Sequence, residues 1–99
     1  MSDLEPYRRR LDKLDDELTR LLGARFDIIR EVADYKREHG IPMMQPARVA
    51  QVRTRYLARG AELQIPADFT ASLFDLLIAA SCNLEDELID APSTPTEGP

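Results

Sequence analysis

The feature that most constrains this chain is a run of apolar residues that recur every three or four positions through its first third. Its members are Leu4, Tyr7, Leu11, Leu14, Leu18 and Leu21, followed by Ile28, Val32 and Tyr35. This spacing predicts one amphipathic helix. Pro6 is tolerated only in a first turn, so the helix starts near Glu5, and Gly40 and Pro42 end it. About 34 residues at ~1.5 Å each make a helix ~50 Å long.

Two shorter helical patterns follow. Pro46 suits the first turn of the second helix, which ends at Gly60, and residues 61–66 form a linker. The third helix starts near Asp68 and runs to about Asp90. Its apolar positions are Phe69, Leu73, Leu77, Ala80, Leu84 and Leu88, and Phe74, Leu76 and Ile78 widen the buried face. No segment alternates with period two, so the sequence predicts an all-α chain.

The length of the first helix also predicts an assembly. Residues 1–90 form a single domain, and the tail at 91–99, rich in proline and small polar residues, is expected to be disordered. A compact domain of this size has a radius of gyration of ~13 Å, which a ~50 Å helix exceeds. The shorter helices cannot cover its whole apolar face. We therefore predict an intertwined homodimer with antiparallel long helices.

Composition excludes several classes of function. The net charge of −5 disfavours nucleic acid as a partner. The chain contains no glycine-rich phosphate loop, and its single histidine and single cysteine argue against a structural zinc site. No apolar run approaches the ~20 residues of a membrane span. Cys82 is interpreted as a buried, inert thiol, and with no signal-peptide pattern the expected location is the cytoplasm.

Two cations fall on the core face of the long helix. The heptad position after Leu21 is Arg25, and Lys36 lies eleven residues later, within ~20° of the same face. Ile29 and Val32 lie between them. Taken alone, Arg25 is best explained as a snorkelling arginine at a dimer seam or as one paired with a carboxylate. Two inward cations together indicate an anionic ligand.

Polar residues on the other helices complete a candidate pocket. Ser81 and Glu85 form an i, i+4 pair on an otherwise apolar stripe, and Arg48 opens the second helix. Arg8 lies at the far end of the long helix, so it reaches this pocket only from a partner chain. A pocket with several cations, a carboxylic acid and a hydroxyl suits a small dicarboxylate.

Four segments in this order resemble the all-helical (type II) chorismate mutases. They are LDKLDDELTRLLGAR, VADYK, the loop leading to PARV, and LFDLLIAASCNLEDEL, which together extend over about residues 4–90. The resemblance implies the three-helix fold of that family, an intertwined homodimer, and a [3,3] rearrangement of a chorismate-like substrate. It implies no metal or cofactor.

The resemblance also implies roles for individual residues. Cations at the positions of Arg25, Arg48 and the partner's Arg8 hold the two substrate carboxylates in that family. Residues at the positions of Lys36 and Glu85 bond the ether oxygen of the breaking C–O bond. Ser81 corresponds to a serine that lies close by.

The loop before the second helix departs from the chorismate-specific members. Those members usually carry acidic residues at the positions of Gln45 and Val49. The stretch GIPMMQPARV is instead similar to the 4-amino-4-deoxychorismate mutase subgroup, which implies a neutral contact from Gln45 at the C4 edge of the substrate ring. Met43 and Met44 then either shield the site from water or clamp two helices together.

Other functions remain open from the sequence. The substrate is chorismate in one alternative, and in another the chain is an isochorismate pyruvate lyase, a class that shares the fold and also places valine after the loop arginine. A non-catalytic helical dimerisation module would explain the heptads. It would not explain why Arg25, Lys36 and Glu85 all face the core.

Overall fold

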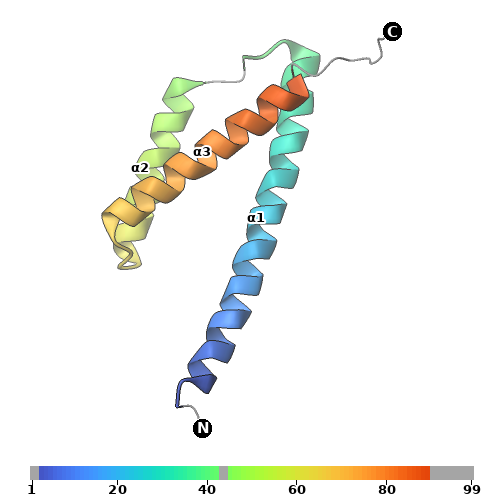
Figure 1. The fold of residues 1–99 in the computed structure, drawn as a ribbon. Helices are drawn as coiled ribbons and strands as arrows, with labels where there is room; N and C mark the ends of the chain where they lie inside the picture. Colours follow the sequence, from blue (N-terminus) through green and yellow to red (C-terminus); the bar gives the residue numbers. More distant parts are fainter. Residues whose placement is uncertain (1–2, 43–44, 90–99) are drawn as a thin grey trace.

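The computed structural model describes residues 3–42 and 45–89, and these fold into helices without any strand (Figure 1). Helix α1 spans Glu5–His39, α2 spans Pro46–Glu62 and α3 spans Ala67–Ile89. The predicted all-α class with three helices is therefore confirmed. Met43, Met44 and the predicted disordered tail lie outside the described residues.

Helix α1 begins and ends where the sequence predicts. Pro6 lies in its first turn, where a missing backbone N–H costs nothing. Gly40 adopts a left-handed conformation with φ 64°, which glycine reaches without strain. The backbone N–H of Ile41 then donates to the carbonyl oxygen of Lys36 at 2.9 Å and so closes the last turn.

Helix α2 ends later than predicted. It continues past Gly60 to Glu62, so the prediction that Gly60 terminates the helix is wrong. Gly60 is buried where α2 meets α3, and a Cβ at this position would lie 2.6 Å from Oγ1 of Thr70. The glycine therefore permits a close approach of two helices. The chain turns afterwards at Gln64, whose φ is 62°, and the N–H of Ile65 donates to the carbonyl of Gly60 at 2.9 Å.

The core is small and centred on α3. Helix α3 packs against both α1 and α2, whereas α1 and α2 do not pack against each other within the described ranges. Phe74 and Leu77 of α3 and Ala33 of α1 are buried. The ring of Tyr56 in α2 lies edge-on to that of Phe74, with the ring centroids 5.1 Å apart. Leu76 is 67% exposed. The prediction that Leu76 widens the buried face is wrong for the single chain, because Leu76 lies ~100° around the helix from Leu77.

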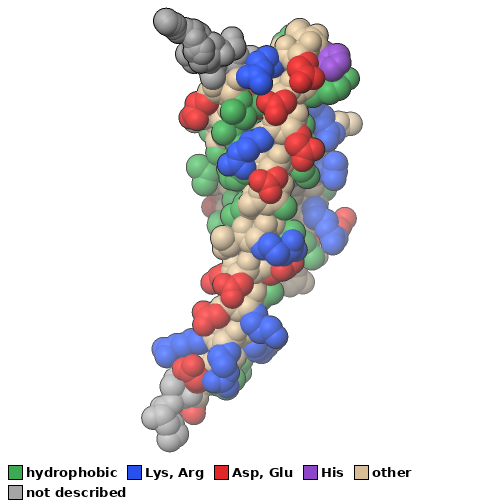
Figure 2. Space-filling model, turned by 90° about the vertical axis from the view of Figure 1, so that its right-hand side faces the viewer, with side chains coloured by type: hydrophobic (Ala, Val, Ile, Leu, Met, Phe, Trp, Pro, Cys, Tyr) green, Lys and Arg blue, Asp and Glu red, His purple; other side chains and the backbone are tan. Residues whose placement is uncertain are grey.

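The N-terminal half of α1 projects away from the other two helices (Figure 1). The radius of gyration is 18.1 Å, well above the ~13 Å of a compact domain of this length. Large apolar side chains are exposed along this half. They are Leu4, Tyr7, Leu11, Leu14, Leu18 and Leu21. The face of α1 seen in Figure 2 instead carries interleaved acidic and basic side chains, which is typical of a solvated surface.

Helix α3 is more apolar than the sequence analysis allowed. The segment Ala67–Leu88 is long and apolar enough to cross a membrane by length and composition, with a mean hydropathy of 1.2. The expectation that no segment approaches a membrane span therefore needs correction. The core helix of a soluble protein satisfies the same criterion. Helix α3 packs against both other helices and buries Thr70, Ser81 and Glu85, as a core helix does.

Candidate active site

A cavity of about 250 Å³ lies where α1 and α3 meet the start of α2. It brings together every predicted site residue except Arg8. The residues that line it are Arg25, Ile29, Val32, Lys36, Gln45, Arg48, Val49, Ile78, Ser81, Cys82 and Glu85. Its mixture of apolar walls with a few charged groups is typical of a small-molecule site, and its volume lies just below the ~300 Å³ of the smaller sites of this kind.

Helix α1 contributes one face with a cation at each end. Arg25 and Lys36 both line the cavity, and Ile29 and Val32 lie between them on the same wall. This arrangement follows from helical geometry, because eleven residues make about three turns. Arg25 and Lys36 therefore lie ~16 Å apart along one rigid helix, and both side chains line the cavity between them.

Helix α3 supplies two buried polar groups opposite these cations. Ser81 is 5% exposed, and its Oγ accepts a hydrogen bond from Nη1 of Arg25 at 2.9 Å. Glu85, one turn later, is 6% exposed. Since α3 is otherwise apolar on this stripe, each polar group needs a partner inside the cavity.

Lys36 and Glu85 form an ion pair across the two helices. Nζ of Lys36 lies 2.8 Å from Oε1 of Glu85, and both side chains are largely buried. Burying such a pair gives little net stability, because desolvation offsets the Coulomb attraction. A fully apolar contact would hold the helices together at least as well. The position of the pair in the cavity wall points to a role in binding or chemistry.

The start of α2 forms the outer rim. Nη1 of Arg48 donates to Oε1 of Gln51 at 2.8 Å, and the guanidinium is exposed. Gln45 is exposed immediately before the helix, and Val49 is half-buried. The backbone N–H groups of Arg48 and Val49 both donate to the carbonyl of Gln45. The rim therefore presents a cation together with neutral side chains.

Arg8 does not take part in this cavity within one chain. It lies seventeen residues before Arg25 on α1, which corresponds to ~25 Å along the helix. No arginine side chain spans that distance. If Arg8 contributes to a cavity, as the sequence predicts, it has to be the cavity of a second chain.

Cys82 lines the cavity, a position that the sequence analysis missed. Burial raises the pKa of its thiol, and the charges of Glu85 and Asp86 raise that pKa further. The thiol is therefore held in its neutral, unreactive form, in agreement with the interpretation as inert. Cys82 is only partly buried, so the prediction of a buried thiol is wrong. Its spacing, four residues after Ile78 and three before Glu85, could have identified it as a wall residue.

The chemistry of the cavity is that of a site for a small anion. Arg25, Lys36 and Arg48 provide positive charge, and Glu85 is the acidic residue in its lining. Within residues 3–42 and 45–89, no group of His, Cys, Asp and Glu side chains is arranged to hold a metal ion. The cavity residues can contribute positioning, hydrogen bonding and fixed charge.

Comparisons with known proteins agree with this geometry. The family model for chorismate mutase type II matches residues 7–86. The 4-amino-4-deoxychorismate mutase of Streptomyces pristinaespiralis is 38% identical over 97% of this chain and 74% of its own length. The enzyme of the same name from Streptomyces venezuelae is 34% identical over 97% of this chain and 93% of its own length.

A more distant relative is the chorismate mutase of Methanocaldococcus jannaschii, which is 23% identical over 88% of each chain. No solved structure matches the chain at a significant level. The family model extends over most of the three helices and over all the cavity residues that they contribute. The chain therefore belongs to the type II chorismate mutase family.

Proposed function

We propose that this chain is an isomerase that rearranges 4-amino-4-deoxychorismate to 4-amino-4-deoxyprephenate. The observation that carries the proposal is the cavity in which Arg25 and Lys36 of α1 lie opposite Ser81 and Glu85 of α3. At its rim the uncharged residues Gln45 and Val49 lie beside Arg48. The two relatives of that name, at 38% and 34% identity, support the choice of substrate.

The reaction needs no nucleophile and no exchange of protons with the solvent. The ether C–O bond breaks ahead of C–C bond formation, so negative charge grows on the ether oxygen and is dispersed again when the new bond forms. Lys36 stabilises this charge from a fixed position. Glu85 can donate a hydrogen bond to that oxygen only when its carboxyl group carries a proton, because a carboxylate would repel the oxygen. The Glu85 carboxylate that pairs with Lys36 in the resting site therefore has to bind a proton first.

The resting ion pair bears on how these two residues act. Lys36 and Glu85 lie in direct contact at 2.8 Å. When substrate binds, the ether oxygen takes a place within reach of both Nζ of Lys36 and the carboxyl group of Glu85. The substrate carboxylates are then held by Arg25 and Arg48 with the partner's Arg8, which fixes the reactive diaxial conformation.

The uncharged side chains at the rim support recognition of a C4-amino group. Gln45 offers a carbonyl oxygen that accepts a hydrogen bond from an amine, and Val49 provides an apolar neighbour. A site that hydrogen-bonds a substrate group discriminates against analogues that pair with it less well. The free thiol of Cys82 in the cavity fits a reducing compartment, and we place the protein in the cytoplasm.

We further infer that the active species is a homodimer with antiparallel α1 helices. The inference is supported by the exposed apolar residues along the N-terminal half of α1, from Leu4 to Leu21. A solvent-exposed apolar stripe of that length is typical of a helix that packs against another chain. The antiparallel arrangement also brings the partner's Arg8 towards the cavity.

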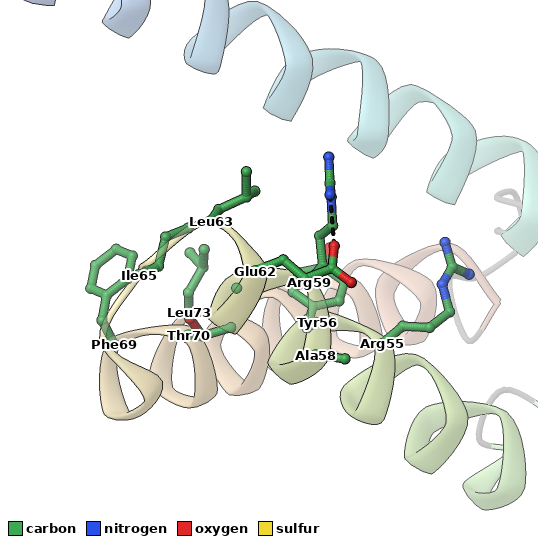
Figure 3. Close-up of a pocket in the computed structure, with 11 residues that line it drawn as sticks. Arg55, Tyr56, Ala58, Arg59, Glu62, Leu63, Ile65, Phe69, Thr70 and Leu73 are labelled. Carbon is green, nitrogen blue, oxygen red and sulfur yellow. Dashed lines mark hydrogen bonds and ion pairs between the residues drawn. The ribbon is translucent and has the colours of Figure 1, made fainter.

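A second hollow, at the turn between α2 and α3, supports the same assembly (Figure 3). It has a volume of about 570 Å³. Leu63, Ile65, Phe69 and Leu73 form its apolar part, and the first three of these are exposed in the single chain. We infer that apolar side chains of a partner's α1 fill this hollow. The hollow is open and apolar, and the exposed stripe of α1 is apolar too.

The proposal is tested by incubating the purified protein separately with 4-amino-4-deoxychorismate, chorismate and isochorismate. We expect the highest kcat/KM for the C4-amino substrate, by ~10²-fold over chorismate if Gln45 makes a dedicated contact. An equal or higher kcat/KM for chorismate would favour the chorismate mutase alternative. Release of pyruvate from isochorismate as the main activity would favour the lyase.

A further inference from the structure

The C-terminal end of α3 lies beside the last turns of α1, where Arg37 joins the two helices (Figure 1). Nη1 of Arg37 donates to the carbonyl oxygen of Leu88 at 2.9 Å. Leu88 is the penultimate residue of α3, so its carbonyl has no amide partner within the helix. Nη2 of Arg37 also lies 3.3 Å from Oδ1 of Asp34, which orients the guanidinium.

This contact lies next to the ion pair of the cavity. Arg37 follows Lys36 on α1, and Leu88 lies three residues after Glu85 on α3. Two neighbouring contacts therefore join the same two turns, one facing the cavity and one on the exposed side. Arg37 does not line the cavity, so it has no direct access to a bound substrate.

The last turns of α3 need an external cation. Asp86 and Glu87 follow Glu85 directly, and the last turn of α3 contains no basic residue. Acidic side chains at a helix C-terminus are unfavourable, because the unpaired carbonyl groups already carry partial negative charge. Arg37 supplies from α1 the positive charge and the donor that this helix end lacks.

We propose that Arg37 is a positioning residue that holds the last turns of α3 so that Glu85 faces Lys36 and the ether oxygen. This inference rests on the proposed function. Helix ends fray readily, and Glu85 lies only four residues before the end of α3. A displacement of Glu85 by a fraction of an ångström weakens a hydrogen bond that matters most in the transition state.

The first test is Arg37→Met, which removes the donors and the charge but keeps an unbranched apolar side chain. We expect kcat for the C4-amino substrate to fall by about 3- to 10-fold while KM changes by less than about 2-fold. Arg37→Lys keeps a cation and a donor and should recover most of the lost kcat. A changed KM together with an unchanged kcat would overturn the assignment of Arg37 as a positioning residue.

A matched control exists on the same helix. Arg30 pairs with Asp27 at 3.1 Å with the same spacing as Arg37 and Asp34, but Asp27 lies on α1 itself, so this pair joins no second helix. Arg30→Met should leave kcat unchanged. An equal fall of kcat in Arg30→Met and Arg37→Met would show a general effect on α1 and overturn the inference.

A double-mutant cycle with Glu85→Ala decides whether Arg37 acts through Glu85. If it does, Arg37→Met should change the residual kcat of Glu85→Ala by less than about 2-fold. If Arg37→Met lowers kcat by the same factor in the wild type and in Glu85→Ala, the inference is overturned. If Arg37→Met does not fold, Asp34→Asn, compared with Asp27→Asn, provides the same test with a smaller expected fall in kcat.

The wild-type measurement separates this inference from the proposed function. A wild-type protein without activity on any of the three substrates overturns the proposed function and the role of Arg37 with it. An active wild type whose kcat is unaffected by Arg37→Met overturns only the role of Arg37.

Discussion

The two halves of α1 share one helix and one apolar periodicity, yet they lie in different environments. The C-terminal half packs against α3, buries Ala33 and lines the cavity with Arg25 and Lys36. The N-terminal half contacts neither of the other helices in Figure 1, and its leucines are exposed. The single chain covers only part of the apolar face that its sequence encodes, since Ile28 and Tyr35 in the C-terminal half are also exposed.

The largest effect is expected where the two halves are proposed to meet across a dimer. Arg25→Ala and Arg8→Ala should each lower kcat/KM by about 10³-fold, because each removes a charged contact to a substrate carboxylate. Mixing and re-annealing the two variants should restore part of the activity, since some heterodimers carry one intact site. Proven heterodimers that remain inactive would contradict a shared site.

Glu85 tests the chemistry of the C-terminal half alone. Glu85→Ala should lower kcat/KM by roughly 10²-fold at every pH, because one preorganised donor is lost. Glu85→Gln keeps a hydrogen-bond donor at this position, so it should retain activity. A glutamine variant as inactive as the alanine variant, with fold and dimer intact, would mean that Glu85 acts as a carboxylate.

Leu14 tests the N-terminal half. Its side chain is 65% exposed in the single chain, so Leu14→Asp would be harmless in a monomer. In the proposed dimer it buries an unpaired charge, and we expect the dimer dissociation constant to rise by about 10²-fold or more. Sedimentation velocity over a concentration series measures this change.

The neighbouring Lys13→Asp makes a matched control for Leu14→Asp, because Lys13 is exposed and adjacent in sequence but does not belong to the apolar stripe. It should leave the dimer intact. Equal dimer dissociation constants for the two variants would argue that the exposed leucines do not form the interface.

Gly60 tests the packing of α2 on α3, the part of the fold that is complete in one chain. A Cβ at this position would lie 2.6 Å from Oγ1 of the buried residue Thr70, which is too close for two non-bonded atoms. Gly60→Ala should therefore destabilise the fold by about 1–3 kcal/mol. Chemical denaturation measures the loss. Thr70→Ala should rescue part of it in the double variant, and additive losses would contradict the predicted contact.

The smallest effect concerns the thiol of Cys82. Because burial and nearby negative charge raise its pKa, the thiol stays protonated at pH values where an exposed cysteine has begun to ionise. Alkylation by iodoacetamide should therefore be slow at neutral pH and accelerate only at more alkaline pH than for a free thiol. A bound substrate analogue should slow it further, and alkylation as fast as that of free cysteine would contradict this environment.

Helix boundaries were predicted best where local chemistry decides them. Pro6, Gly40 and Pro46 act through their own backbones, so α1 and the start of α2 lie where the sequence predicts. Gly60 was misread because its reason lies in another helix. A glycine that ends a helix and a glycine that admits a neighbouring threonine look the same in a single sequence.

The cavity was predicted in its composition but not in its contacts. Helical phase was enough to place Arg25, Lys36, Ser81 and Glu85 on inward faces. It could not reveal that Arg25 bonds Ser81 and that Lys36 bonds Glu85, because those pairs depend on the register of α3 against α1. Arg37 was missed for the same reason, since its partner is a backbone carbonyl with no sequence signature.

The sequence by itself determined the helical class, the length of α1 and the residue types that face inward, because these follow from periodicity and from the backbone limits of proline and glycine. Only the tertiary structure decided which inward groups touch, how close α2 and α3 come at Gly60, and where α3 ends relative to Lys36. Those features depend on how side chains of one helix fit between those of another, and that fit is a property of pairs of helices.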